Sequence, residues 1–86
     1  MISKEVLIIN PSGLHARPAA QLCDLCQEFI CDLKIEYNNE EIEPRSIISI
    51  LCAAVRPGSK ITLIADGEDE QKAIDEISLL IESFDE

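Results

Sequence analysis

The chain contains one histidine, His15, and an arginine, Arg17, stands two residues after it. An imidazole is a nucleophile that is largely neutral near pH 7, and a guanidinium is a planar, permanently charged fork that suits phosphate. A lone histidine is more often a structural hydrogen-bonding group than a catalytic one. Whether His15 and Arg17 have a structural or a catalytic role therefore depends on the secondary structure that positions them.

His15 lies in a predicted turn between a strand and a helix. The apolar, β-branched run near the N-terminus predicts a strand at Glu5–Asn10, and a helix is expected from about Ala16 to Phe29. Gly13 can supply the positive φ that such a turn needs, and Pro18 fits the first helical turn. The N–H groups and the dipole at a helix start favour an anion. Together these features predict a site that can hold a phosphoryl group on His15.

The segment Gly13-Leu-His-Ala-Arg-Pro-Ala19 resembles the active-site motif of HPr, the family of histidine-containing phosphocarriers of the bacterial phosphotransferase system. The order of predicted elements agrees with that family along essentially the whole chain. The resemblance implies that His15 accepts a phosphoryl group at Nδ1 from enzyme I and passes it to IIA domains, in sugar uptake. It also implies that no cofactor and no metal are needed.

The predicted catalytic residues are His15 and Arg17, and the predicted phosphate-binding residues are Ser12, Ala16 and Arg17. Ser12 could donate a hydrogen bond to the phosphate or to the backbone of the turn. We favour the turn, because short hydroxyl side chains commonly bond to nearby backbone groups. Arg17 could be a solvated surface residue, but only 7 basic residues exist and this one is close to His15.

Ser46 aligns with the serine that a dedicated HPr kinase/phosphorylase modifies in many members of the family. It is also a helix N-cap candidate, and both roles are compatible. The helix predicted at Ile47–Ala54 is apolar nearly all round, so some of its side chains must stay exposed, with Ile47 and Ile48 expected to do so. The resemblance implies that this helix and the start of the first one dock enzyme I and IIA domains. The predicted docking residues are Arg45, Ile47, Ile48 and Leu51.

The remaining elements follow from period-2 and helical patterns. Further strands are predicted at Asp32–Tyr37, Glu40–Glu43 and Lys60–Asp66, and a last helix is expected to open at Glu68. The order βαββαβα predicts an α+β open-faced sandwich, with a four-stranded antiparallel sheet and three helices on one face. Asn38-Asn39 is predicted to form a tight hairpin turn. We expect residues 1–86 to form a single domain, and the resemblance implies the same fold.

The net charge is −10, from 17 acidic and 7 basic residues, which disfavours nucleic acid and anionic membranes as partners. No apolar run approaches the length of a membrane span, and the opening residues do not resemble a signal peptide. We therefore expect a cytoplasmic monomer with reduced thiols. Fewer lysines stand around the predicted docking face than in better-known family members, which leaves the identity of the partners open.

Two alternatives to a phosphocarrier remain at this stage. One is a regulatory binding module, including nitrogen-linked or catabolite-control relatives, that signals through phosphorylation of His15 or Ser46. Regulatory-only relatives lose the histidine, whereas this chain keeps it. The other is a thiol redox protein that uses the C-x-x-C pair Cys23 and Cys26. These cysteines fall within the first helix on its apolar stripe, so we interpret them as core thiols.

Overall fold

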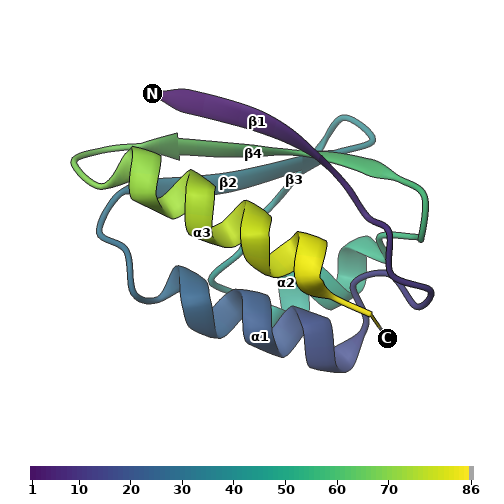
Figure 1. The fold of residues 1–86 in the computed structure, drawn as a ribbon. Coiled ribbons are helices and arrows are strands. Elements are labelled where there is room, and N and C mark those ends of the chain that lie inside the picture. Colours follow the sequence, from purple (N-terminus) through teal and green to yellow (C-terminus); the bar gives the residue numbers. More distant parts are fainter. Residues whose placement is uncertain (86) are drawn as a thin grey trace.

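The computed structural model describes residues 1–85. Its elements follow in the order β1 (Ile2–Leu7), α1 (Ala16–Cys26), β2 (Asp32–Tyr37), β3 (Glu40–Ile42), α2 (Ile47–Ala53), β4 (Lys60–Asp66) and α3 (Glu70–Ser83). The four strands form one antiparallel sheet, and the helices cover one of its faces (Figure 1). The predicted α+β open-faced sandwich is confirmed.

The strand order in the sheet is β1-β4-β2-β3, so the first and last strands of the chain are neighbours. Side chains alternate along β4, where Ile61, Leu63 and Ala65 are buried toward the helices. β2 and β3 are joined by a two-residue turn at Asn38 and Asn39, whose φ angles are 51° and 65°. Asparagine tolerates this left-handed conformation, which explains why the hairpin forms where it was predicted.

The core between the sheet and the helices is mostly aliphatic, and Phe29 and Phe84 are the aromatic residues buried in it. Its fully buried members include Ile8, Leu22, Ile35, Ile50, Ile61 and Ile81. Burying a side chain of this size contributes roughly 1.5–3 kcal/mol, which is how the apolar stripes of the helices hold them on the sheet. Within residues 1–85, no helix has the length and apolar character needed to span a bilayer.

The first strand lies earlier in the chain than predicted, at Ile2–Leu7 rather than Glu5–Asn10. Its ladder with β4 ends where Leu7 pairs with Lys60. Ile8 then bonds to the turn before β4, donating from its N–H to the Ser59 carbonyl at 2.8 Å and accepting from the Gly58 N–H at 2.7 Å. This leaves the following residues free to form the loop that leads to α1.

α1 ends at Cys26 rather than Phe29, because the next segment is held by α3 instead of continuing the helix. The carboxylate of Asp69, the N-cap residue of α3, accepts hydrogen bonds from the backbone N–H groups of Ile30 at 2.9 Å and Cys31 at 3.0 Å. These backbone donors, the Ile30 N–H foremost, lower the pKa of the Asp69 carboxyl. The same contact explains why α3 begins at Glu70, later than predicted.

The short elements around α2 also end sooner than predicted. β3 stops at Ile42, because the N–H of Glu43 donates to the Ser49 hydroxyl at 2.9 Å instead of joining the sheet. α2 stops at Ala53, because Ala54 adopts a left-handed conformation with a φ of 52°. A left-handed residue ends a helix, and it turns the chain here toward the loop before β4.

Candidate functional site

His15 is the N-cap residue of α1, and its side chain is exposed. Its backbone is extended, with φ −89° and ψ −164°, and its carbonyl accepts the hydrogen bond of the Ala19 N–H at 2.8 Å. Its side chain makes no capping hydrogen bond to the first turn. The imidazole therefore stands at the helix N-terminus without covering it.

The first turn of α1 consists of Ala16, Arg17 and Pro18. Proline has no N–H, so the backbone donors of this turn are those of Ala16 and Arg17, which an α-helix does not use in its own ladder. Ala16, Arg17 and Ser12 are all exposed, whereas Pro18 is buried. The predicted phosphate-binding residues thus gather around the helix start, where the dipole favours an anion. Their contact with phosphate stays a prediction.

The loop before His15 is fixed by hydrogen bonds that the sequence interpretation did not identify. The Asn10 side-chain Nδ2 donates to the Gly13 carbonyl at 2.6 Å, and the Gly13 N–H donates to the Asn10 carbonyl at 3.3 Å. Gly13 has a φ of 65°, as the turn was expected to require. The side-chain bond of this turn therefore comes from Asn10, and the available signal was an asparagine at the end of the predicted strand, just before the turn.

A shallow surface hollow of about 350 Å³ brings His15 together with the loop after α2. It is lined by Ser12, Leu14, His15, Leu51, Ala54, Val55, Arg56 and Pro57. The Leu14 N–H donates to the Val55 carbonyl at 3.2 Å, which joins the two loops directly. Leu51 belongs to α2, so the exposed face of that helix continues into the His15 site. Arg56 was not among the predicted residues.

Three large apolar side chains of α2 are exposed: Ile47 by 37%, Ile48 by 69% and Leu51 by 41%. Ile50 on the same helix is fully buried. The expected exposure of Ile47 and Ile48 is confirmed, and we call Ile47, Ile48 and Leu51 the α2 surface. A contiguous apolar area of this kind is typical of a site that binds another protein.

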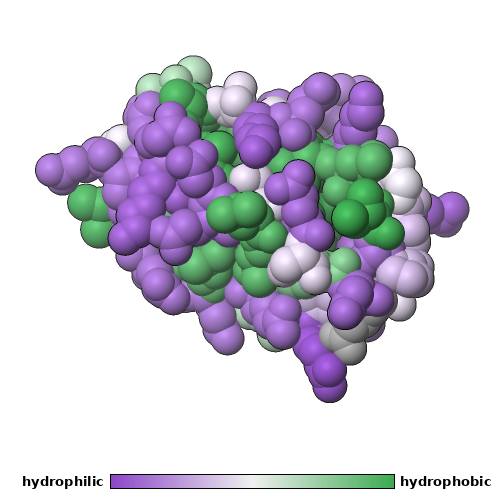
Figure 2. Space-filling view, viewed as in Figure 1, coloured by the Kyte–Doolittle hydropathy of each residue, from purple (hydrophilic) through white to green (hydrophobic). Residues whose placement is uncertain are grey.

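Other parts of the surface are largely hydrophilic on the side that Figure 2 displays, with apolar patches between the polar side chains. One patch lies at the right, where the chain leaves β1 (Figure 2), and Leu7 and Ile9 are exposed in that segment. Leu79 is exposed on α3. Exposed apolar side chains are thus not confined to the α2 surface, so a test of docking needs one of these residues as a control.

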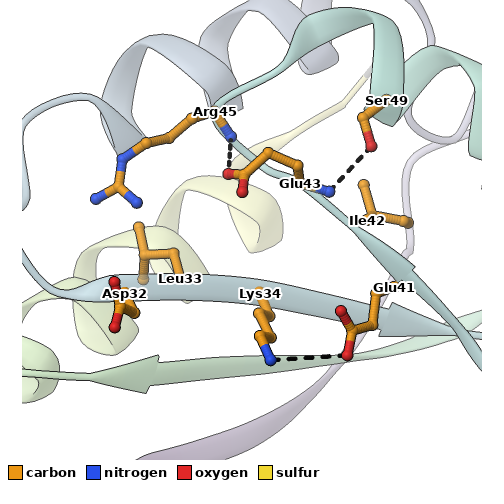
Figure 3. A pocket seen from close by; sticks show the side chains of 8 residues that line it. All are labelled: Asp32, Leu33, Lys34, Glu41, Ile42, Glu43, Arg45 and Ser49. Carbon is orange, nitrogen blue, oxygen red and sulfur yellow. Dashed lines mark hydrogen bonds and ion pairs between the residues drawn. The ribbon is translucent and has the colours of Figure 1, made fainter.

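Ser46 caps α2, as predicted, since its hydroxyl accepts a hydrogen bond from the Ser49 N–H at 3.3 Å. Its own N–H donates to the Glu43 carbonyl at 3.0 Å. A second hollow, different from the one at His15, lies next to this capping turn (Figure 3). At its rim the Glu43 N–H donates to the Ser49 hydroxyl, and the Lys34 ammonium lies 3.7 Å from the Glu41 carboxylate. A phosphate on Ser46 stays a prediction.

Arg45 has an internal role, and its place in the docking set stays a prediction. Its Nη2 donates to the carbonyl oxygens of Phe29 at 2.7 Å and Cys31 at 2.9 Å, across the loop between α1 and β2. Its backbone N–H donates to Glu43 at 3.0 Å, and its side chain extends away from Glu43 and Ser49 (Figure 3). The guanidinium is therefore used to hold the fold.

The C-x-x-C pair lies in α1, as the sequence indicated. Cys26 is buried, and burial raises the pKa of its thiol to about 12. The Cys23 thiol is half-buried and donates to the Arg45 carbonyl at 3.3 Å. A thiol that stays protonated near pH 7 is a poor nucleophile, which disfavours redox chemistry at this pair. In the part of the chain that the structure describes, no cluster of three or more His, Cys, Asp or Glu side chains could hold a metal ion.

A family model described as "PTS HPr component phosphorylation site" matches residues 2–83. The chain belongs to the HPr family. The phosphocarrier protein HPr of Buchnera aphidicola is 41% identical over 81 residues, which cover 94% of this chain and 95% of that protein. The HPr-like protein Crh of Bacillus subtilis is 33% identical over 82 residues, or 95% of this chain and 96% of Crh.

The fold agrees with solved members of the HPr family. The crystal structure of HPr-C-His from Thermoanaerobacter tengcongensis superposes with a TM-score of 0.92 at 36% identity, and the match covers 96% of this chain and 93% of that chain. The resemblance to the HPr family, which the motif at Gly13–Ala19 indicated, is therefore confirmed over most of the chain. The general role of the family, phosphocarrier of the phosphotransferase system, applies to this chain.

Proposed function

We propose that this HPr-family protein carries a phosphoryl group on His15, which it takes from phosphorylated enzyme I and gives to IIA-type acceptors of sugar uptake. One observation carries the proposal: the only histidine is the exposed N-cap residue of α1, next to first-turn amides that its side chain leaves uncovered. The family model, whose description names a phosphorylation site, supports a phosphorylated residue within residues 2–83.

The proposed transfer step balances between two imidazoles. A ring nitrogen of His15, Nδ1 by analogy with the family, attacks the phosphorus on the donor's histidine. The new N–P bond forms as the donor's N–P bond breaks, His15 releases a ring proton, and the leaving imidazole takes one up. Arg17 and the first-turn amides stabilise the charge on the transferring group, an effect of the kind that typically lowers a barrier by about 2–4 kcal/mol per donor.

Intact-mass spectrometry after incubation with enzyme I and phosphoenolpyruvate tests this proposal. We expect the wild type to gain one phosphoryl group that acid removes and base does not. His15→Ala should gain none while melting at an unchanged temperature, because the side chain is exposed and makes no capping bond. A gain that persists in His15→Ala, or its absence in the wild type, would contradict the proposal.

We also propose that the α2 surface docks enzyme I. Support comes from its exposure and from Leu51, which lines the hollow that contains His15. Ile48→Ser should raise the KM for phosphorylation by enzyme I about tenfold, since an apolar side chain at an interface centre commonly contributes more than 1 kcal/mol. The matched control is Leu79→Ser on α3, which is similarly exposed at 66% and should leave the KM unchanged. Equal KM values for the two variants would argue against this surface.

Regulation at Ser46 by an HPr kinase/phosphorylase forms part of the proposal. A phosphate there would add about two negative charges at the start of α2, which a helix N-terminus tolerates. The added charge would stand directly before Ile47 and Ile48, where it would oppose the docking of a partner. We propose the cytoplasm as the compartment, in keeping with the unpaired cysteines at positions 23, 26, 31 and 52.

A regulatory binding module is the second candidate, favoured by the 33% identity to the HPr-like protein Crh. The two functions differ in what happens after His15 is phosphorylated. A carrier passes the phosphoryl group to a IIA domain, whereas a regulatory module keeps it and changes its binding partner. Transfer from the phosphorylated chain to purified IIA domains distinguishes them.

A further inference from the structure

We propose that Arg56 is a second phosphate-binding arginine of the His15 site, which contacts the phosphoryl group on His15 from the loop between α2 and β4. The proposal rests on the proposed function in one respect, namely that the phosphoryl group is carried by His15. It adds to the predicted set of Ser12, Ala16 and Arg17 a residue far from them in sequence.

The position of Arg56 is fixed by backbone contacts to the loop that carries His15. Its neighbour Val55 accepts the hydrogen bond of the Leu14 N–H at 3.2 Å, and its own carbonyl accepts from the Ser59 N–H at 3.2 Å. A Cβ placed on Gly13 would lie 3.3 Å from the Arg56 carbonyl carbon. The two loops therefore touch through their backbones, and Arg56 and His15 line the same hollow.

The guanidinium of Arg56 is available for an external anion. The residue is exposed, and its side chain has no hydrogen bond or ion pair with any part of residues 1–85. Arg45 differs, since two backbone carbonyls accept hydrogen bonds from its guanidinium. The charge of Arg56 is therefore not paired with an acidic side chain of the described residues, although the chain has 17 acidic residues and 7 basic ones.

The charge of the hollow favours a phosphate as that anion. Its lining contains Arg56 and His15 but no carboxylate, although acidic residues outnumber basic ones in the chain by 17 to 7. A phosphoryl group on His15 carries close to two negative charges near pH 7, and a guanidinium can bind it through two parallel N–H bonds. Arg17 belongs to the first turn of α1, whereas Arg56 belongs to the loop between α2 and β4, so the two arginines come from different parts of the chain.

A titration of the phosphorylated protein tests the proposal without enzyme I. Phosphoramidate, a small P–N phosphoryl donor, phosphorylates exposed imidazoles: the ring nitrogen attacks phosphorus, ammonia leaves, and a ring proton passes to solvent. The ³¹P chemical shift is then followed with pH at low salt in the wild type, Arg56→Gln, Arg56→Lys and the control Lys72→Gln. Lys72 is an exposed cation in the first turns of α3, at the end of that helix remote from the His15 site (Figure 1).

We expect Arg56→Gln to raise the pH midpoint of the phosphoryl group by roughly half a unit, because a neighbouring cation favours the doubly charged form. Arg56→Lys should restore part of the shift, and Lys72→Gln should leave the midpoint unchanged. High salt should abolish the difference between Arg56→Gln and the wild type. Each variant should melt like the wild type, since both side chains are exposed.

Identical titrations of the wild type and Arg56→Gln would overturn the proposal, even if Arg56→Gln raised the KM for enzyme I. That pattern would mean that Arg56 contacts the partner rather than the phosphoryl group. Failure of phosphoramidate to modify His15 would also overturn it, since the hollow would then not admit a phosphoryl group. If the titration shift occurs but enzyme I does not phosphorylate the chain, the proposed function fails while the assignment of Arg56 stands.

Discussion

The backbone N–H of Leu14 donates a hydrogen bond to the carbonyl oxygen of Val55 at 3.2 Å. Together with the two bonds between Ile8 and the turn at Gly58 and Ser59, this bond joins the loop that carries His15 to the loop that follows α2 and carries Arg56. The side chains of both Leu14 and Val55 are buried, so the junction is anchored in the core on both sides. The spacing between the two walls of the His15 hollow therefore depends on how closely these loops approach each other.

Gly13→Ala should disrupt this junction. Gly13 has a φ of 65°, and a Cβ there would collide with the Val55 carbonyl oxygen. The left-handed conformation costs about 1–2 kcal/mol for alanine, and the collision adds to it, so we expect a loss of roughly 2–4 kcal/mol. Chemical denaturation measures the loss. Gly58→Ala is the control, since Gly58 has a φ of 83° but no atom within 4 Å of its Cβ position. Equal losses in the two variants would mean that the Val55 contact is unimportant.

Ala54→Gly should stabilise the protein. Ala54 holds a left-handed φ of 52° at the end of α2, where glycine avoids the Cβ penalty. The gain of about 1–2 kcal/mol is partly offset by the greater freedom of glycine in the unfolded chain, which leaves a net gain of about 0.5–1 kcal/mol. Ala53→Gly, one residue earlier and inside the helix, should instead lose about 1 kcal/mol. Thermal melting should therefore move in opposite directions for the two neighbours, and a shift in the same direction would contradict the backbone argument.

The sequence could predict those residues of the candidate site that lie close together along the chain. His15, Arg17 and the glycine turn lie within five consecutive residues, Gly13–Arg17, and the helix start follows from the pattern after them. Arg56 could not be found in this way. It lines the same hollow as His15 because the two loops meet, at Leu14 and Val55 and again at Ile8 and Gly58, and no periodicity in either segment predicts these contacts.

Some element ends were mispredicted for a related reason. The propensity of the chain beyond Cys26 is compatible with helix, but Asp69 captures the N–H groups of Ile30 and Cys31 from another element. The guanidinium of Arg45, which stays a predicted docking residue, bonds to two backbone carbonyls that are also distant in sequence. Tertiary hydrogen bonds override the local helix preference after Cys26, and a local sequence pattern does not reveal such distant partners.

Asp69 should make stability depend on pH in the acid range. Backbone donation, led by the Ile30 N–H, lowers the pKa of its carboxyl below its ordinary value in the folded state. A carboxyl with a lowered folded pKa binds protons more readily when unfolded, so its contribution is complete above about pH 4–5 and is lost as the pH falls through the folded pKa. The stability difference between the wild type and Asp69→Asn should therefore be constant near neutral pH and shrink below about pH 4.

Urea denaturation at a series of pH values measures this difference. Asp75→Asn is the control, because its carboxylate accepts a hydrogen bond from the exposed Gln71 side chain rather than from loop backbone. That variant should stay within about 0.5 kcal/mol of the wild type, as exposed substitutions usually do. A stability difference for Asp69→Asn that does not shrink in acid would rule out the carboxylate as the group that holds the loop.

Ser46→Asp should separate the capping role of Ser46 from its proposed role in docking. The Ser46 hydroxyl accepts a hydrogen bond from the Ser49 N–H at 3.3 Å, and an aspartate can accept the same bond at a helix N-terminus that favours negative charge. The melting temperature of Ser46→Asp should therefore equal that of the wild type, whereas Ser46→Ala should lose about 1 kcal/mol of stability because the capping bond is lost.

Phosphorylation by enzyme I should slow in Ser46→Asp, because the new charge precedes the exposed Ile47 and Ile48. In Ser46→Ala it should continue at the normal rate. A Ser46→Asp variant that melts several degrees lower yet is phosphorylated normally would mean that Ser46 caps α2 and has no effect on the docking of enzyme I.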